Sequence, residues 1–194
     1  MNSKAGYTKW GSSMKIRDAK ISDAGDLAEL YRYYVENTAY TFEYAAPTAE
    51  EFSKRITGIS ARFPFLVCED GGELLGFAYA HQLRERKAYQ WVCETSIYAR
   101  TGHARRGIGT MLYAELLPAL RRQGFVKAYA VLGSANVGSG AFHEKTGFTL
   151  EATLPGIGFK LGAWHDIRYY SYELNPACGE LPEPLEYRQL EKIL

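Results

Sequence analysis

The sequence predicts a single α/β (α+β) domain with one mixed β-sheet of about seven strands and about four helices on its faces. Segments with helical periodicity alternate with short β-rich segments, in the order β-α-α-β-β-β-α-β-α-β-β. The chain has 194 residues, the length of one ordinary domain. Because 46% of the residues are hydrophobic and 23% are charged, a globular protein with a sizeable core is expected.

The first part of the chain predicts a strand followed by two helices. Met14–Asp18 is the strand, and Ser22 is the expected N-cap of the first helix. The apolar face of this helix carries Leu27, Leu30, Tyr31 and Tyr34. Thr48 and Glu51 form a capping box that begins the second helix. The apolar side chains of the second helix are Phe52, Ile56 and Ile59.

Three strands and a third helix are expected next. Asp70-Gly71-Gly72 indicates a hairpin between strands over 65–69 and 73–80. A long strand over 88–98 is rich in aromatic and β-branched residues. Gly107 opens the third helix and Gly124 ends it, while Pro118 should kink or shorten it. The core-facing side chains of this helix are Ile108, Met111, Leu112, Leu116 and Leu120.

The rest of the chain completes the sheet and leaves two tails. A strand over 127–132 precedes a short helix over 136–146, and strands over 148–154 and 159–174 follow. We therefore expect the domain to span residues 14–174. Residues 1–13 lack the apolar stretch of a signal peptide and precede a second methionine, so they are interpreted as an extension. Residues 175–194 are interpreted as a C-terminal tail.

Charge, cysteines and hydropathy exclude several classes of protein. Lys and Arg number 23 against 22 Asp and Glu, so no strong field favours nucleic acid or an anionic membrane. The three cysteines are far apart and form no CxxC pair, which indicates a reducing compartment and no zinc site. No apolar run approaches the roughly 18 residues of a membrane span. A cytoplasmic location and no bound metal are expected.

A glycine-bearing loop between a strand and a helix is the first candidate site. The segment from Tyr98 to Gly109 can present the free N–H groups of a helix start to an anion. Arg105 and Arg106 add positive charge suited to a pyrophosphate. An ordinary strand-to-helix turn with a solvated basic edge is the alternative, and the motif is neither a P-loop nor a dinucleotide fingerprint.

Two further candidates are ionisable side chains inside predicted elements. Glu94 lies within an apolar strand, where desolvation raises the pKa of a carboxyl group toward that of a useful base. A glutamate paired with a nearby Arg or Lys is the alternative. His143 lies on the short helix that Asn136 and Ser139 begin. A lone histidine on a helix is more often a surface or core-edge residue than a catalytic one.

Taken together, these places resemble the GNAT superfamily of N-acetyltransferases, and within it the phosphinothricin (methionine sulfoximine) acetyltransferase group. The resemblance covers about residues 16 to 174. The matching segments, in order, are YVENTAYTFEYAAPT, RFPFLVCEDGGELLGFAYA, RERKAYQWVCETSIYA, HARRGIGTMLYAELL, NVGSGAFHEKTGF and GFKLGAWHDI. A long ordered series of this kind is far more specific than any single motif.

The resemblance implies roles for individual residues. Glu94 matches the family's general base, and His143 matches a histidine implicated near the chemistry. The residues implied to bind acetyl-CoA are Ile97, Tyr98, Arg105, Arg106, Gly107, Ile108, Gly109, Thr110, Asn136 and Ser139. Those that fall where the group lines its acceptor pocket are Phe42, Arg86 and Tyr89. Ala104 departs from the Gln or Arg that begins the family's pyrophosphate motif, so weakened cofactor binding is expected.

The resemblance also implies a reaction. Glu94 would accept a proton from the ammonium group of a small amine, which then attacks the thioester of acetyl-CoA. A backbone N–H near Ile97 or Tyr98 would stabilise the negative charge that develops on the carbonyl oxygen. An acceptor of the phosphinothricin or methionine sulfoximine type and a homodimer are implied. Two alternatives stay open, namely a relative that acetylates a protein N-terminus or another amine, and a non-catalytic acyl-CoA sensor.

Overall fold

The computed structural model describes residues 14–103 and 105–190, and it confirms a mixed sheet of seven strands in the order β1-β2-β3-β4-β5-β7-β6. Every neighbouring pair is antiparallel except β4 and β5, which are parallel. The strands are β1 (Lys15–Asp18), β2 (Phe65–Asp70), β3 (Glu73–Gln82), β4 (Val92–Ala99), β5 (Lys127–Gly133), β6 (Thr149–Lys160) and β7 (Ala163–Glu173).

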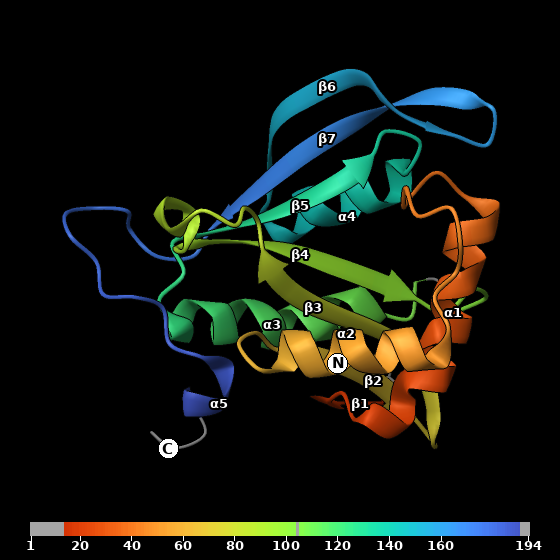
Figure 1. Cartoon of the computed structure of the whole chain (residues 1–194), viewed down its shortest axis with the longest axis horizontal. Helices are drawn as coiled ribbons and strands as arrows, with labels where there is room; N and C mark the ends of the chain where they lie inside the picture. Colours follow the sequence, from red (N-terminus) through yellow and green to blue (C-terminus); the bar gives the residue numbers. More distant parts are fainter. Residues whose placement is uncertain (1–13, 104, 191–194) are drawn as a thin grey trace, which may run out of the picture.

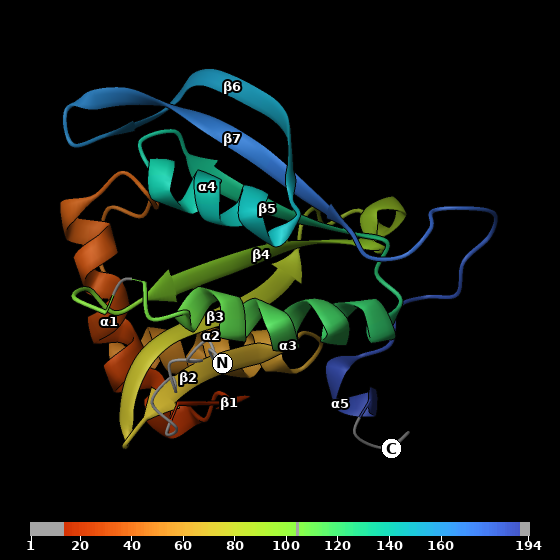
Figure 2. The same ribbon diagram turned by 180° about the vertical axis from the view of Figure 1, so that it is seen from behind.

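Helices lie on both faces of this sheet. They are α1 (Ala24–Asn37), α2 (Ala49–Ser60), α3 (Ile108–Gln123), α4 (Val137–Thr146) and the short α5 (Tyr187–Leu190), with 3-10 turns η1 (Ile21–Asp23) and η2 (Lys87–Tyr89). Figure 1 shows α1 and α2 on one face, and Figure 2 shows α3 and α4 on the other. Among the described residues, no helix is long and apolar enough to cross a membrane.

Each face of the sheet has its own hydrophobic core. On one face α1 and α2 pack their apolar sides against β2 and β3, with Leu27, Phe52 and Phe77 almost fully buried. On the other face α3 packs Leu112 and Leu116 against the sheet. Burial of apolar surface on both faces makes the central strands rigid supports for any side chain they carry.

The parallel strands β4 and β5 separate before either of them ends. Their pairing runs from Val92 opposite Lys127 to Thr95 opposite Ala130, whereas β4 continues to Ala99 and β5 to Gly133. Within the described residues, the edge of β4 that faces β5 therefore has no ladder partner beyond Thr95. The divergence opens a space in the middle of the sheet.

The structure corrects the expected starts of α1 and β4. Ser22 lies within η1 and is not the N-cap of α1, because a carboxylate oxygen of Asp23 accepts the N–H of Lys20 at 2.7 Å. The capping box of Thr48 and Glu51 is confirmed. The long strand begins at Val92 and not at 88, because the N–H groups of residues 89 and 90 bond locally within η2.

Pro118 does not shorten α3, which continues to Gln123. A proline deprives the carbonyl four residues earlier of its N–H partner, here the carbonyl of Ala114. Both Ala114 and Pro118 face solvent, so water can satisfy that carbonyl group.

The hairpin of β6 and β7 also differs from expectation. The turn lies at Leu161 and Gly162, both with positive φ, so Phe159 and Lys160 belong to β6. Strand β6 continues through Pro155 because it is an edge strand, where a missing N–H costs no ladder bond. Residues 1–13, interpreted above as an extension, lie outside the described residues.

Candidate active site

Glu94 lies in a cavity of about 230 Å³ where β4 and β5 diverge. Glu94, Ser96 and Tyr98 alternate with core-facing residues along β4, so their side chains share one face and line this cavity. The other strand contributes Val131 and Gly133. Glu94 and Tyr98 therefore lie on the same face of β4.

The surroundings of Glu94 have two opposite effects on the pKa of its carboxyl group. Burial of the carboxyl group raises its pKa above the ordinary value, and electrostatic interactions with His81 and Arg84 partly offset this effect. His81 lies opposite Glu94 on β3, and its Nε2 is 3.7 Å from Glu94 Oε1. The side chain of Glu94 keeps 24% of its surface exposed, so its carboxylate is accessible to a ligand in the cavity.

The loop between α1 and α2 closes one side of the cavity. Tyr40, Thr41, Phe42 and Glu43 of this loop are among the residues that line it. The loop is tied to the β6–β7 hairpin, because Lys160 Nζ donates to the Thr41 carbonyl at 2.7 Å and the Tyr44 hydroxyl donates to the Phe159 carbonyl. Phe42 therefore lies in the same cavity as Glu94, as predicted.

Hydrogen bonds from side chains of α1 and α2 hold the loop between these two helices in place. Arg55 of α2 donates to both carboxylate oxygens of Glu43, at 2.8 and 2.7 Å. The Tyr31 hydroxyl bonds to Thr41 Oγ1 at 2.7 Å and to Glu43 at 2.9 Å. Burial would raise the pKa of Glu43, but the bonds from Arg55 and Tyr31 outweigh it and keep the pKa low. Glu43 is accordingly an anchoring carboxylate.

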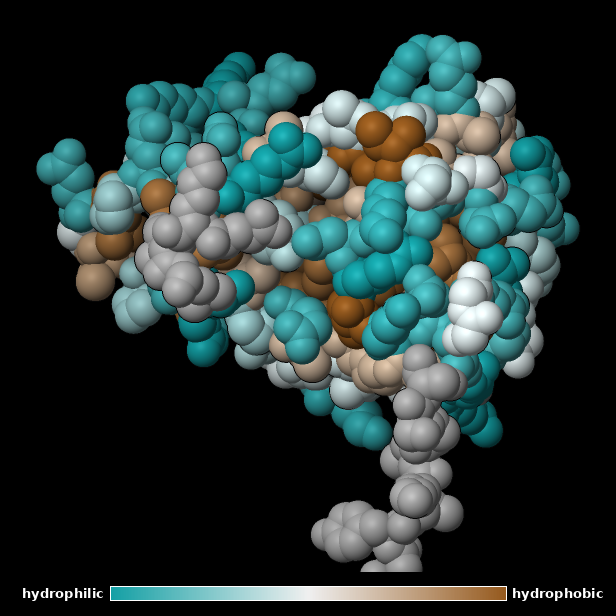
Figure 3. Space-filling view, turned by 90° about the horizontal axis from the view of Figure 1, so that it is seen from below, coloured by the Kyte–Doolittle hydropathy of each residue, from teal (hydrophilic) through white to brown (hydrophobic). Residues whose placement is uncertain are grey.

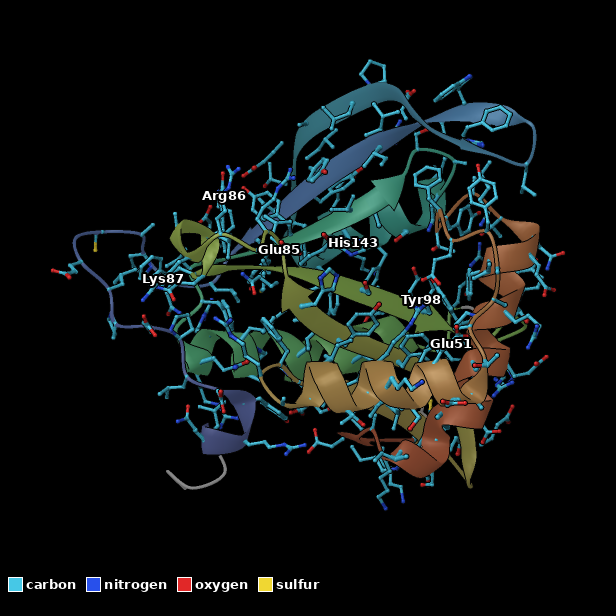
Figure 4. The ribbon with its side chains drawn as sticks, in the orientation of Figure 1. Glu51, Glu85, Arg86, Lys87, Tyr98 and His143 are labelled. Carbon is cyan, nitrogen blue, oxygen red and sulfur yellow. The ribbon has the colours of Figure 1, made fainter. Side chains whose placement is uncertain are left out.

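Arg86 and Tyr89 lie in a second cavity of about 650 Å³, which shares no lining residue with the one that contains Glu94 but is lined by Tyr129, the β5 residue opposite Glu94. Figure 4 shows Arg86 on the loop beside the start of β4 and Tyr98 toward its other end. Arg84 lines this second cavity and also lies close enough to Glu94 to affect its pKa. The sequence interpretation did not identify Arg84 and His81 as neighbours of Glu94. The pairing of β3 with β4, which places His81 opposite Glu94, was needed to recognise this.

A groove of about 910 Å³ runs along the first turn of α3 and one side of α4. Predicted cofactor residues that line it are Arg105, Arg106, Gly107, Ile108, Gly109 and Thr110. Helix α4 contributes Gly138, Ala141, Phe142 and Lys145, which the sequence interpretation did not single out. The structure thus brings the residues of the glycine-bearing loop together with a second helix.

The start of α3 is suited to an anion. Gly107 precedes the helix in a left-handed conformation with φ of 82°, and its position provides no side-chain cap for the first N–H groups. Free N–H groups at a helix start attract phosphate oxygens. Arg106 pairs with Asp70 at 2.7 Å and contacts His103, whereas Arg105 has an exposed side chain. Ala104, where the motif departs from the family, lies outside the described residues.

The remaining predicted residues do not line the groove, and Tyr98, which was implied to bind acetyl-CoA, lines the Glu94 cavity instead. Asn136 caps α4 by accepting the N–H of Ser139 at 3.2 Å, and neither residue is among those that line the groove. The side chain of Ile97 packs in the core on the α3 side and lies 3.5 Å from where a side chain at Gly109 would begin. His143 is 0% exposed and lines neither the groove nor the Glu94 cavity.

Known proteins resemble this chain over most of its length. Residues 16–168 match the acetyltransferase (GNAT) domain family. A phosphinothricin N-acetyltransferase of Streptomyces viridochromogenes is 33% identical, covering 88% of this chain and 91% of that protein. An L-methionine sulfoximine/L-methionine sulfone acetyltransferase of Pseudomonas paraeruginosa is 30% identical, covering 84% and 96%.

Solved structures of acetyltransferases also resemble this chain over most of its length. A phosphinothricin acetyltransferase of Sinorhizobium meliloti in complex with acetyl-CoA superposes with a TM-score of 0.84 at 32% identity, covering 91% of this chain and 99% of that one. An acetyltransferase of Salmonella typhimurium with acetyl-CoA also has a TM-score of 0.84, at 27% identity and coverage of 88% and 99%. The resemblance inferred from the sequence is confirmed, and the chain belongs to the GNAT family of acetyltransferases.

Proposed function

We propose that this acetyltransferase moves the acetyl group of acetyl-CoA to the amino group of a small amino-acid-like acceptor, with Glu94 as the general base. The observation that carries the proposal is the position of Glu94 in a small cavity at the divergence of β4 and β5. A groove suited to a phosphate-bearing cofactor lies on the α3 side of the same strand. The two substrates would therefore meet across β4.

The size of the Glu94 cavity supports a small acceptor. A volume of about 230 Å³ corresponds to roughly eight water molecules at about 30 Å³ each. A protein N-terminus would need an open groove leading to the carboxylate. The relatives named for phosphinothricin and for methionine sulfoximine or sulfone support an acceptor that carries a tetrahedral polar group. Arg84 and Arg86 supply guanidinium groups that can bind such oxygens.

The proton transfer assigned to Glu94 follows from its environment. An amine attacks a thioester only in its neutral form, so a base must remove a proton from the bound ammonium group. Partial burial raises the pKa of Glu94 and makes the carboxylate a stronger base than one in water. Beyond Thr95 the unpaired edge of β4 within the described chain offers N–H groups to the carbonyl oxygen of the acetyl group.

The replacement Glu94→Gln tests this assignment. Glutamine keeps the size of the side chain but accepts no proton, so kcat should fall by roughly 10²–10⁴-fold. The Kd for acetyl-CoA, measured by calorimetry, should stay the same because Glu94 lies outside the groove. Activity should partly return at high pH, where the amine is already neutral.

Glu144→Gln is the matched control, because Glu144 is exposed on α4 and lies in neither cavity. It should leave kcat unchanged. A folded Glu94→Gln variant with normal kcat at neutral pH would refute the base assignment. A wild-type protein that binds acetyl-CoA but acetylates no amine would instead favour the sensor alternative.

We further infer that the enzyme is a cytoplasmic homodimer. Cys68, Cys93 and Cys178 are all free, and Cys178 is exposed, which fits a reducing compartment. Exposed apolar side chains gather on the β6–β7 hairpin, at Leu154, Ile157, Phe159, Leu161 and Trp164. In the view of Figure 3, from below, apolar patches are interrupted by hydrophilic side chains. Several exposed apolar side chains on one hairpin are typical of a protein interface.

A further inference from the structure

A buried chain of hydrogen bonds links the central strand to α3 and α4. Thr95 Oγ1 of β4 lies 3.0 Å from the hydroxyl of Tyr113 on α3. That hydroxyl lies 2.9 Å from Nε2 of His143 on α4, and His143 Nδ1 lies 2.7 Å from the carbonyl oxygen of Ser139. Tyr113 is 1% exposed and His143 is 0% exposed, so solvent does not reach this chain.

The partners of His143 determine the positions of its protons. A carbonyl oxygen can only accept, so Nδ1 must donate to Ser139. In the neutral ring Nε2 is then an acceptor, and the Tyr113 hydroxyl donates to it. Burial lowers the pKa of His143, which agrees with a neutral ring. Both ring nitrogens are therefore occupied by partners within the protein.

The chain lies on the opposite face of β4 from Glu94. Successive side chains of a strand point to opposite faces, so Thr95 points toward α3 while Glu94 points into the acceptor cavity. A proton passing between Glu94 and His143 would have to cross the sheet. His143 consequently has no direct path to an amine held at Glu94.

The Tyr113–His143 bond instead connects the two helices that line the cofactor groove. Nearer the mouth of the groove, Gly109 of α3 approaches Phe142 of α4 so closely that an added Cβ would lie 3.0 Å from the ring. Tyr113 is one helical turn after Gly109, and His143 directly follows Phe142. Two successive contacts thus fix the separation of α3 and α4.

We infer that Tyr113 and His143 are positioning residues that hold α3 and α4 at the spacing the cofactor requires, and that His143 does not remove the proton from the amine. The inference rests on the proposed use of this groove for acetyl-CoA. It replaces the role near the chemistry that the family resemblance implies for His143. The bond acts on affinity for the cofactor, because the groove would widen or become mobile without it.

The test compares Tyr113→Phe and His143→Gln with the wild type. Each variant should raise the Kd for acetyl-CoA, measured by calorimetry without an acceptor, by roughly tenfold. At saturating substrates kcat should stay within about threefold of the wild-type value. The decline of kcat at low pH, the acid limb of the pH profile, should lie at the same pH as in the wild type. The double variant should show little further loss of affinity, because both changes break the same bond.

Tyr172→Phe is the matched control, since Tyr172 of β7 packs against Phe148 in the same core but does not line the cofactor groove. Its Kd should equal that of the wild type. If His143→Gln instead slows turnover by roughly two orders of magnitude or changes the acid limb, the inference is overturned in favour of a chemical role. Lower thermal stability with an unchanged Kd would also overturn it. The Kd for acetyl-CoA is measured without an acceptor. The comparison of the variants therefore stays valid even if the proposed class of acceptor is wrong.

Discussion

At the scale of single residues, the charges around Glu94 set the pH at which it can act. Burial raises its pKa, and His81 and Arg84 each lower it again. The proposed mechanism requires the carboxylate, so activity should be lost as the pH falls through the pKa of Glu94. The pH at which activity is lost on the acid side therefore depends on how far burial raises the pKa of Glu94 and how far His81 and Arg84 lower it.

Replacing Arg84 should move the acid limb in a defined direction. Arg84→Gln removes a positive charge that favours the carboxylate, so the pKa of Glu94 should rise further and the limb should shift to higher pH. The pH profile of kcat at saturating acceptor measures the shift. Arg86→Gln is the control, since Arg86 is not among the groups that change the pKa of Glu94. An unshifted limb in Arg84→Gln would mean that Glu94 does not control it.

Sequence spacing predicts which candidate residues share a strand face, but not how residues from different elements are grouped. Glu94 and Phe42 line one cavity, and Tyr98, which the resemblance implied to bind acetyl-CoA, lines the same cavity because alternation along β4 places it on the face of Glu94. Arg86 lies in a different cavity. The contact of His81 with Glu94 depends on the alignment of two strands, and the burial of His143 depends on how two helices pack. Neither the contact nor the burial can be predicted from the spacing of residues within one element.

At the scale of elements, the β6–β7 hairpin supports the wall of the acceptor cavity. An added Cβ at Gly158 would lie 2.5 Å from Cζ of Phe42, and the ring of Phe42 lies near His165 of the same hairpin. A side chain at Gly158 would therefore push Phe42 from its place. Glycine is required here because of this close approach.

Gly158→Ala should consequently weaken acceptor binding. Displacing a packed ring costs about 1 kcal/mol or more, which corresponds to a KM for the acceptor raised by at least about fivefold. The Kd for acetyl-CoA should be unaffected. Gly158→Ala/Phe42→Leu should recover part of the loss, because the shorter side chain leaves room for the methyl group. Gly58→Ala is neutral by comparison, since nothing lies within 4 Å of its added Cβ.

The turn that begins α1 depends on an ion pair. Arg17 of β1 donates to both carboxylate oxygens of Asp23, at 2.7 and 3.0 Å, and the Lys20 N–H donates to the same carboxylate. Burial would raise the pKa of Asp23, but these bonds outweigh it and lower the pKa. A carboxylate with a lowered pKa stabilises the fold above its unfolded pKa and loses that effect as the pH falls through the folded value.

Asp23→Asn should therefore destabilise the protein at neutral pH and much less in acid. Loss of the charged partner of Arg17 should lower the free energy of unfolding by about 2 kcal/mol at pH 7. Urea denaturation between pH 7 and pH 3 measures the difference from the wild type, which should shrink toward low pH. The exposed pair Lys54–Glu50 provides a control, and Glu50→Gln should have little effect at any pH. A constant difference would exclude the ionic contribution.

Elements with strong local patterns were predicted well, and their ends were predicted less well. The capping box of α2 and the hairpin turn between β2 and β3 involve adjacent residues, so the sequence specifies them directly. The start of β4 at Val92 depends on local bonds in η2, and β6 tolerates Pro155 because it lies at the sheet edge. Such features follow from tertiary position and not from local propensity.

At the scale of the whole molecule, the C-terminal tail packs against distant parts of the chain. Gln123 at the end of α3 donates to the carbonyl groups of Arg62 and Leu185, at 2.8 and 2.7 Å. The Tyr187 N–H also donates to Arg62, and Leu190 is buried. The tail that the sequence left without a role thus covers the ends of α2 and α3 in the described part of the chain. Contacts between segments so far apart have no local sequence pattern.

The other large feature of the molecule is the apolar surface of the β6–β7 hairpin. Figure 1 shows the hairpin projecting at one edge of the sheet, where α1 and α2 do not cover it. Trp164 is 68% exposed and Leu161 is 60% exposed at its tip. Leaving such side chains in water is unfavourable, and a second copy of the chain would bury them. The hairpin also bears Gly158, so an interface here would stabilise the wall of the acceptor cavity.

Trp164→Glu should convert the proposed dimer to a monomer. A charged side chain in the centre of an apolar interface would be buried without a partner, which disfavours association strongly. Light scattering at micromolar concentration should give twice the 21.8 kDa chain mass for the wild type and the single chain mass for the variant. Ile21→Glu, at a position 60% exposed on η1, should leave the dimer intact. If the wild type itself is a monomer, or if Trp164→Glu stays dimeric, the hairpin is not the interface.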